Sequence, residues 1–430
     1  MGRSISSTSW FTQNGLAFFC CCLIIAGMMT THFARSLSSI GMAGLLLTSL
    51  WSLRQKNAAG QVFRYPYFVC FLVIYALHLT GLLYPENASP KTFERDLAMK
   101  LPLVLIPVAF ALLPAISRFR LRLLYYFFLV CVFVGSLYST GYYLLHFAEV
   151  NELYKHSKIM ETPTNHVRYS LMVAFAIFVG YRFVRQDFYW RRPWEKYLQV
   201  VITVWLFIFL HMLAVRSGLV FFYAVAGLGL AFDFFFRKRY KQTVLLGAAL
   251  GLSLVVAFFT LPTFYNKFFL TIEDVQSAEH AKSAHDYSIA GRVYSYKVAA
   301  EIIKDHPVKG VGIGNMDAEM AARYRTMFPQ ILERGHILPH NQFIYFAAVF
   351  GLAGLLVFLI CFYYPAFRFA GRFEPLFFIH YLIISLSFLF ETTLETQVGL
   401  TYSIIFILLP LWHFKAAEPG EASWKNGSFF

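Results

Sequence analysis

Charged residues are scarce in this chain of 430 residues. Asp, Glu, Lys and Arg make up only 14% of it, whereas hydrophobic residues make up 58% and the mean hydropathy is +0.57. Soluble globular domains contain about 25% charged residues. The composition therefore excludes an ordinary soluble enzyme, a disordered chain and a nucleic-acid-binding domain. It indicates a membrane protein that crosses the bilayer many times.

Cysteine is also rare, and its placement excludes the disulfide framework of a secreted domain. All six cysteines fall inside apolar runs and none lies in a long polar loop, so we interpret them as packing residues. No internal repeat is visible at a period of 20–50 residues. The N-terminal apolar run from Gly15 lacks a convincing cleavage site, which predicts a retained first span rather than a removed signal peptide.

Apolar runs of about 20 residues predict about twelve transmembrane helices and an all-α fold. The runs are 15–31, 36–53, 65–83, 99–116, 121–147, 169–184, 197–215, 217–236, 243–261, 341–361, 376–390 and 399–414. The chain then divides into spans one to nine (1–261), a large periplasmic loop (262–340), spans ten to twelve (341–414) and a cytoplasmic tail (415–430).

The distribution of charge predicts that both termini are cytoplasmic. With the N-terminus inside, 20 of the 37 Lys and Arg residues and 6 of the 23 Asp and Glu residues fall on the inner side. The inner side then carries the whole net charge of +14, and the outer side balances 17 positive against 17 negative residues. This is the pattern of the positive-inside rule. The basic composition therefore requires no nucleic acid or other anionic partner.

The longest outer loop, 262–340, is predicted to fold. Apolar residues recur at three- and four-residue steps from Ile289 to Ile303 and predict one helix, which Pro307 stops. A second helix is predicted from Asp317 to Phe328, because acidic residues precede basic ones along it, as the helix dipole favours.

Two arginines at the outer membrane surface are candidate anion ligands. Arg216 stands between two apolar runs with almost no loop, and a charge at that depth suggests function. Its alternative interpretation is a side chain that reaches to the interface. Arg292 opens the first loop helix, where free N–H groups already favour anions, and its planar fork matches phosphate oxygens. Its alternative interpretation is a solvated helix charge.

His340, at the outer entry of span ten, is the candidate base. A neutral imidazole can take a proton near pH 7, although an interfacial histidine without a catalytic role is an equal alternative. His336 lies four residues earlier, but Pro339 interrupts the helix and no carboxylate or thiol cluster accompanies the pair, so no metal site is expected. The glycines from Gly310 to Gly314 do not form a nucleotide motif and suggest close backbone packing or an anion nest.

Other polar residues near the outer surface have less support as candidate substrate ligands. Arg168, at the outer end of span six, is either a third basic ligand or an interfacial arginine. Lys297 and Arg334 are candidates for an acceptor groove.

Two pairs of charged residues occur at four-residue spacing. Glu391 and Glu395, in the last outer loop, either orient an acceptor or form the solvated end of a span. Asp233 and Arg237 are predicted to pair with each other.

Five motifs occur in an order that resembles the O-antigen ligase and O-antigen polymerase superfamily of bacterial inner-membrane glycan transferases. The first three are Arg216-Ser217, then Gly291-Arg292, then His306-Pro307-Val308-Lys309-Gly310-Val311-Gly312-Ile313-Gly314-Asn315. His340-Asn341-Gln342-Phe343 and Phe350-Gly351-Leu352-Ala353-Gly354-Leu355 follow. The resemblance covers about residues 213–360, and an O-antigen ligase is the nearest match.

The resemblance implies that the chain transfers a glycan from an undecaprenyl-diphosphate carrier at the periplasmic face of the inner membrane. The acceptor would be the lipid A core or another acceptor glycolipid, the partners would include membrane lipids, and no cofactor, metal or nucleic acid would be needed. The implied fold is the multi-span, all-α architecture of lipid-dependent glycosyltransferases. His340 would be the base and Arg216 and Arg292 would stabilise the departing diphosphate, in an inverting displacement. Arg168, Asn341 and Lys297 would help to bind substrate.

Two other functions remain as alternatives. An O-antigen polymerase or a protein O-glycosyltransferase would use the same scaffold. A transporter or flippase also commonly has twelve spans, but it is expected to carry internal repeats and charges near the midplane. Here the ionisable candidates gather at one membrane face, which favours glycan transfer.

Overall fold

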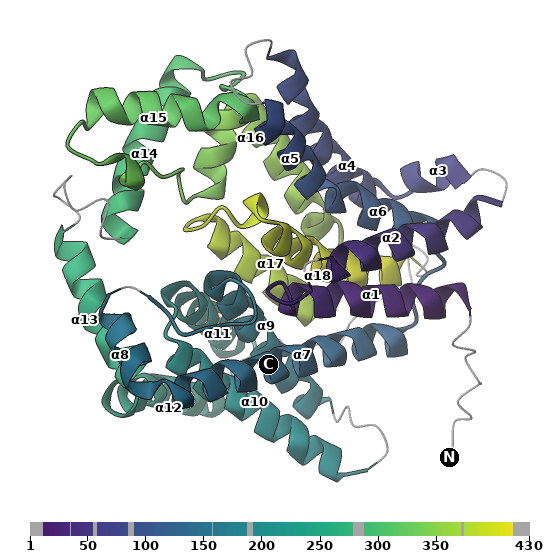
Figure 1. The fold of residues 1–430 in the computed structure, drawn as a ribbon. Helices are drawn as coiled ribbons and strands as arrows, with labels where there is room; N and C mark the ends of the chain where they lie inside the picture. Colours follow the sequence, from purple (N-terminus) through teal and green to yellow (C-terminus); the bar gives the residue numbers. More distant parts are fainter. Residues whose placement is uncertain are drawn as a thin grey trace.

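The computed structural model describes residues 12–34, 36–54, 58–84, 90–156, 158–186, 192–277, 288–370 and 374–415. Within these ranges all regular structure is helical (Figure 1). The predicted cytoplasmic tail falls outside the described residues except for Lys415, and so do residues 278–287 of the predicted periplasmic loop.

Each of the twelve predicted runs overlaps a helix, although not every one of these helices is long enough to cross a membrane. In the described part of the chain, seven helices are long and apolar enough to cross a membrane, and four shorter helices are also apolar. The chain is therefore an all-helical membrane protein. The seven are α7 (Arg118–Leu145), α9 (His166–Arg185), α10 (Trp194–Leu213), α11 (Arg216–Phe235), α12 (Tyr240–Thr260), α16 (Gln342–Arg368) and α18 (Gln397–Phe414). The four shorter apolar helices are α1 (Gln13–Met29), α2 (Leu37–Leu50), α4 (Pro66–Leu79, extended by a 3-10 turn) and α17 (Pro375–Phe388). The remaining predicted run, 99–116, contains the 11-residue helix α6 (Pro102–Leu112).

Helices α9 and α18 begin at side-chain caps. Asn165 caps α9 by accepting hydrogen bonds from the N–H groups of Val167 and Arg168 at 3.0 and 3.4 Å. Thr396 caps α18 in the same way. An N-cap oxygen satisfies backbone donors that a helix start leaves free, so these residues determine where each helix begins. The predicted start of span six at residue 169 is therefore a few residues late.

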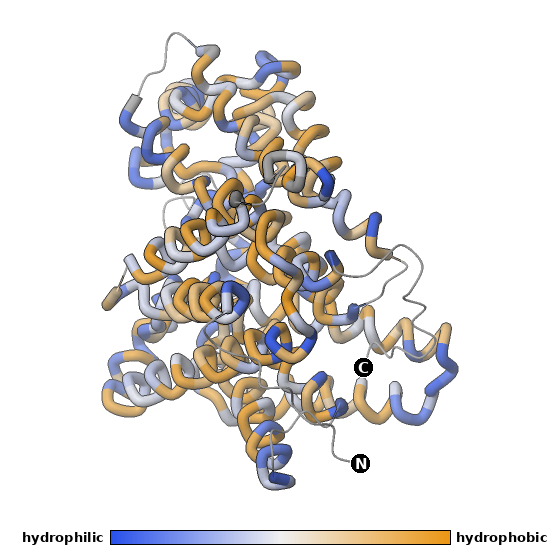
Figure 2. The backbone as a smooth tube through the Cα atoms, turned by 90° about the vertical axis from the view of Figure 1, so that its right-hand side faces the viewer, coloured by the Kyte–Doolittle hydropathy of each residue, from blue (hydrophilic) through white to orange (hydrophobic). Residues whose placement is uncertain are grey.

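Helix α9 lies at the centre of the bundle, where it packs against α7, α10, α11 and α17 (Figure 1). The apolar stretch of α9 is 83% buried inside the protein, whereas that of α12 is only 6% buried. Hydrophobic residues run along most helices, and hydrophilic residues concentrate at turns and helix ends (Figure 2). This distribution suits helices surrounded by lipid with polar ends in water.

Four amphipathic or polar helices gather on one side of the bundle, at the left of Figure 1. They are α8 (Phe147–Lys155), α13 (Pro262–Gln276), α14 (Ser288–Asp305) and α15 (Met316–Met327). The two predicted loop helices are confirmed as α14 and α15, and α13 adds a third. Short connecting helices (α3, Ala58–Phe63; α5, Pro90–Lys100) and five short 3-10 turns complete the described fold.

The glycine-rich segment after α14 packs directly on a break in α16. The N–H groups of Val311 and Gly312 donate to carbonyl oxygens of α16 at 2.9 Å each, and Leu352 donates to the carbonyl of Pro307 at 2.8 Å. Gly351 has φ 70° there, and a Cβ atom at this position would lie 2.0 Å from the carbonyl oxygen of Val308. The predicted close backbone packing is confirmed, and it ties the outer loop to the helix that follows His340.

Two minor predictions also agree with the structure. Arg237 Nε lies 3.5 Å from Asp233 Oδ1, so the predicted pair is present. The six cysteines are free and lie within helices, as packing residues would.

Candidate active site

Glu391 is the centre of the polar cluster at the N-terminal end of α9. It follows α17, and only 4% of its surface is exposed. Its carboxylate accepts hydrogen bonds from Arg168 Nη1 at 3.2 Å and Arg292 Nη2 at 2.5 Å, and it lies 3.3 Å from Nδ1 of His340. Three predicted site residues thus converge on one carboxylate. The alternative interpretation of Glu391 as the solvated end of a span is wrong.

The environment keeps Glu391 ionised and orients His340. Burial alone would raise the pKa of Glu391, but the hydrogen bond to His340 and the charges of Arg292 and Arg168 hold this pKa below its usual range. A carboxylate at Nδ1 favours the proton on that nitrogen, which makes Nε2 the basic one. The His340 side chain is 37% exposed, so an acceptor can reach it.

Arg168 holds the Glu391 loop in place. Its Nη2 donates to the backbone carbonyl of Thr392 at 3.1 Å, in addition to the ion pair with Glu391. Its side chain is buried and does not line the cavity described next. Of the two interpretations of Arg168, the geometry favours a residue inside the cluster over one at a lipid interface, and it suggests a positioning role.

A polar cavity of about 160 Å³ opens beside Glu391. Elements α9, α11, α13, α14 and the loop after α17 form its walls. The lining residues are Ile159, His166, Val167, Val215, Arg216, Ser217, Lys267, Ser288, Arg292 and Glu391. Three cationic side chains, Arg216, Lys267 and Arg292, therefore share one cavity, and the cavity has the character of an anion site.

Arg216 joins three elements at the cavity wall. Its Nη1 lies 2.9 Å from Asp274 Oδ2, and its Nη2 lies 3.4 Å from the hydroxyl of Ser288. Asp274 is buried, and it also accepts the backbone N–H of Ile289 at 2.8 Å. The start of α11 is thereby tied to the end of α13 and the start of α14. About a quarter of the Arg216 side chain remains exposed for a ligand.

Lys267 is a cavity residue that the sequence reasoning did not single out. Burial and the nearby charge of Arg216 lower the pKa of Lys267 to about 8, and Asp274 only partly opposes this effect. The sequence feature that could have revealed it is a single lysine among the largely apolar residues of α13.

Two predicted substrate ligands lie elsewhere. The side chain of Asn341 caps α16 by accepting from Phe343 N at 2.9 Å and Ile344 N at 3.0 Å, and it donates to the Leu389 carbonyl at 3.0 Å. Lys297 is exposed, and its Nζ lies 4.7 Å from the ring centre of Tyr294. Neither lines the cavity. Arg334 is also exposed, in the 3-10 turn Glu333–Gly335.

A second buried network anchors the far end of the Glu391 loop. Lys100 is fully buried, and its Nζ donates to the Leu394 carbonyl and to Glu395 Oε2, both at 2.7 Å. The amide of Gln342 bonds both the other Glu395 oxygen (2.8 Å) and the N–H of Leu394 (2.9 Å). Glu395 is therefore a structural ion-pair partner, and its interpretation as a solvated span end is wrong too.

Comparison with known families shows what part of the chain is similar to. Residues 201–359 match the family model of the O-antigen ligase. This part of the chain is therefore similar to O-antigen ligases. Proteins of this family are glycan-transferring enzymes, and the family implies lipid-linked glycan substrates. No curated protein matches the chain.

The matched segment contains only part of the cluster. It includes Arg216, Arg292 and His340, whereas Arg168 and Glu391 lie outside residues 201–359. The cluster therefore depends on helices on both sides of the family domain, which explains why the motifs alone did not reveal the central carboxylate.

Proposed function

We propose that the protein transfers a glycan from undecaprenyl diphosphate to the lipid A core at the periplasmic face of a bacterial inner membrane. The observation that carries the proposal is a cavity with Arg216, Lys267 and Arg292 beside a histidine that a buried carboxylate orients. The proposal includes twelve spans, cytoplasmic termini, the division 1–261, 262–340, 341–414 and 415–430, and a site that faces the periplasm.

The charge of the site matches the diphosphate of the donor. A diphosphate diester carries two negative charges. The cavity lining contains three cations, Arg216, Lys267 and Arg292, and one anion, Glu391. Behind the lining, Arg168 pairs with Glu391 and Asp274 pairs with Arg216, so these six charged residues carry two more positive than negative charges. Partly exposed guanidinium groups can form charge-assisted hydrogen bonds to the diphosphate as it departs.

The reaction is a direct displacement at the anomeric carbon. Nε2 of His340 takes the proton of the acceptor hydroxyl as its oxygen attacks. The new bond between the anomeric carbon and the acceptor oxygen forms while the bond to the diphosphate oxygen breaks, and the electron pair leaves with the diphosphate. Attack from the side opposite the leaving group inverts the anomeric configuration. Glu391 stabilises the imidazolium that results.

In the proposed reaction the guanidinium and ammonium groups neutralise the negative charge of the diphosphate, as a divalent cation does in many diphosphate enzymes. The proposed reaction is therefore metal-independent. Transfer should continue at an unchanged rate in excess EDTA. A loss of activity that added Mg²⁺ or Mn²⁺ restores would contradict this part of the proposal.

The acceptor is tested by supplying purified protein with a carrier-linked glycan, with and without lipid A core, and separating the products on a gel. We expect one-step attachment that requires lipid A core. A ladder of longer carrier-linked glycans without lipid A core would instead identify a polymerase, and attachment to a protein hydroxyl would identify a protein O-glycosyltransferase. Movement of labelled carrier between leaflets without covalent product would favour a transporter.

A further inference from the structure

A buried lysine binds the far end of the loop that carries Glu391. Lys100 is the last residue of α5, and its side chain is fully buried. Its Nζ donates to the carbonyl oxygen of Leu394 and to Oε2 of Glu395, both at 2.7 Å. The ammonium group therefore holds the loop both by its backbone and by a side chain. An ionisable residue buried in a membrane protein is costly, so it suggests a functional role.

The same loop is attached to the segment that carries His340. Residues 340, 341 and 342 each contact the loop 389–395. In chain order, the contacts are His340 Nδ1 with the Glu391 carboxylate (3.3 Å), Asn341 with the Leu389 carbonyl (3.0 Å), and Gln342 with Glu395 (2.8 Å) and the N–H of Leu394 (2.9 Å). Lys100 binds the loop at the third of these contacts. Because only three residues separate Glu391 from Glu395, a shift of the loop at Glu395 would also move Glu391 relative to His340.

The Lys100 ammonium is itself held by groups outside the loop. Asp96, four residues earlier on α5, lies 3.9 Å from it, and Asp96 lies 2.9 Å from Nδ1 of His78 on α4. Burial alone would raise the pKa of Asp96, but the hydrogen bond to His78 and the charge of Lys100 hold this pKa below its usual range. Helix α4 in turn packs against α6 and α16. Lys100 therefore connects the loop to the helical framework.

We propose that Lys100 is a positioning residue for glycan transfer, which fixes the loop 391–395 against the segment 340–342 and so sets the contact between Glu391 and His340. The link to catalysis rests on the proposed function. Lys100 does not line the cationic cavity, so it acts through Leu394 and Glu395 rather than on the substrate.

Lys100→Met keeps an unbranched side chain and removes the ammonium group. We expect kcat for glycan transfer to fall roughly 10²-fold, since a small misplacement of a catalytic group has an effect of that size. The donor KM should change little, because the cationic cavity is intact. Hydrogen exchange measured by mass spectrometry should be faster than in wild type in peptides that cover residues 340–345 and 389–396.

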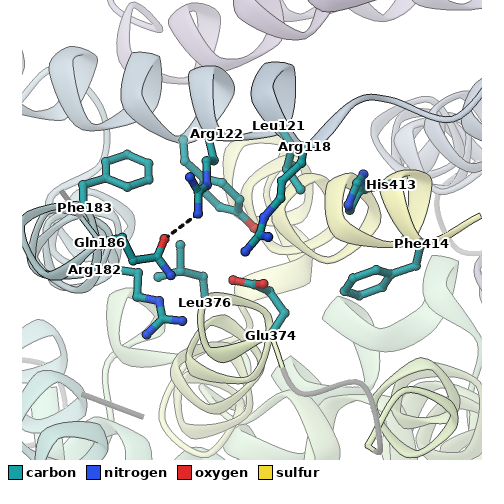
Figure 3. A pocket seen from close by; sticks show the side chains of 11 residues that line it. Arg118, Leu121, Arg122, Arg182, Phe183, Gln186, Glu374, Leu376, His413 and Phe414 are labelled. Atoms are coloured by element: carbon teal, nitrogen blue, oxygen red, sulfur yellow. Dashed lines mark hydrogen bonds between the residues drawn. The ribbon is translucent and has the colours of Figure 1, made fainter. Parts of the chain in front are cut away.

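Lys415→Met is the matched control. Lys415 is another largely buried lysine, and its Nζ donates to three backbone carbonyls around the end of α6. It lies at the other end of α18 from the Glu391 loop, directly after Phe414, which lines a separate pocket (Figure 3). Its substitution should lower thermal stability and leave kcat and the exchange of residues 389–396 unchanged.

The double variant Lys100→Met/Glu395→Gln separates positioning from stability. The side chain of Glu395 is only 13% exposed, and the second substitution removes the carboxylate that Lys100→Met leaves unpaired. Thermal stability should therefore largely return. The value of kcat should stay low, because no ammonium group holds Leu394 and residue 395. Recovery of kcat together with stability would overturn the proposal.

Two further outcomes count against the proposal. A kcat of Lys100→Met within about threefold of wild type would overturn it, since misplacement predicts a roughly 10²-fold loss. If wild-type protein transfers no glycan, the proposed function fails, and hydrogen exchange decides the role of Lys100 by itself. Equal exchange of residues 389–396 in wild type and Lys100→Met would then overturn the inference.

Discussion

Glu391 gathers residues that lie far apart in the sequence. Its partners Arg168, Arg292 and His340 are 223, 99 and 51 residues away. A carboxylate buried among two arginines and a histidine is stable only if all its partners are in place, because a buried charge that loses its partner costs several kcal/mol. We infer that Glu391 both shapes the site and sets the proton position on His340.

Glu391→Gln keeps the size of the side chain and removes its charge. We expect kcat to fall roughly 10²–10³-fold, the scale of losing one preorganised electrostatic contact, and thermal stability to fall because Arg168 is left buried without its anion. Transfer assays and thermal unfolding measure the two effects. Glu333→Gln, at a carboxylate whose side chain is 78% exposed, is the control and should change neither. Turnover of Glu391→Gln within about threefold of wild type would contradict the role.

Lys267 should make kcat/KM for the donor depend on pH. Its pKa is lowered to about 8 by burial and by Arg216, so the ammonium is charged below that pH and neutral above it. If its charge binds the diphosphate, kcat/KM for the donor should fall as the pH rises through about 8, since this ratio reports the free enzyme. Lys267→Arg keeps its charge throughout, so its profile should lack this fall. If the pH profiles of wild type and Lys267→Arg superimpose, Lys267 is excluded from donor binding.

At the scale of helices, periodicity and hydropathy predicted most of the fold. Every predicted run overlaps a helix, and the first loop helix ends at Asp305, two residues before the proline that was expected to stop it. The sequence did not reveal α13 as a separate helix, because its apolar residues continue those of α12. It also did not reveal the break in α16, since one glycine in an apolar run has no distinct hydropathy.

Gly351→Ala tests the contact between the outer loop and α16. Alanine would have to adopt φ 70°, and its Cβ atom would clash with the Val308 carbonyl. A strained backbone of this kind costs about 1–3 kcal/mol, so the thermal unfolding temperature should fall. Gly251→Ala in α12 is the control, because nothing lies within 4 Å of a Cβ atom there. Equal unfolding temperatures for the two variants would show that the loop does not depend on Gly351.

At the scale of the whole molecule, the candidate active site gathers residues that precede, lie within and follow the segment matched by the family model. Charge counting predicted which helix ends face the cytoplasm. Arg216 and Arg292, near the proposed donor site, were identified from their unusual positions in the sequence. The burial of Glu391 and Lys267, and the ion pairs of Glu391, could not be predicted, because they depend on contacts between distant helices. Asn341, which the sequence suggested as a substrate ligand, instead caps a helix in the structure.

The proposed sidedness predicts which surfaces are labelled in intact cells. Cysteine placed at Glu333, in the outer loop, should react with a membrane-impermeant thiol reagent, whereas cysteine at Lys241, at the start of α12, should react only after the membrane is opened. Mass spectrometry of the purified protein measures both. Both positions are exposed, so the opposite labelling pattern would reverse the proposed orientation.

The most direct test of the account is the rate of glycan transfer by wild-type and His340→Gln protein with the same carrier-linked donor and lipid A core. The account predicts that His340→Gln loses roughly 10²–10⁴-fold in kcat, the usual contribution of a general base, while the donor KM changes little because the cationic cavity is intact. Near wild-type turnover by His340→Gln would contradict the assignment of His340 as the base that the Glu391 carboxylate orients.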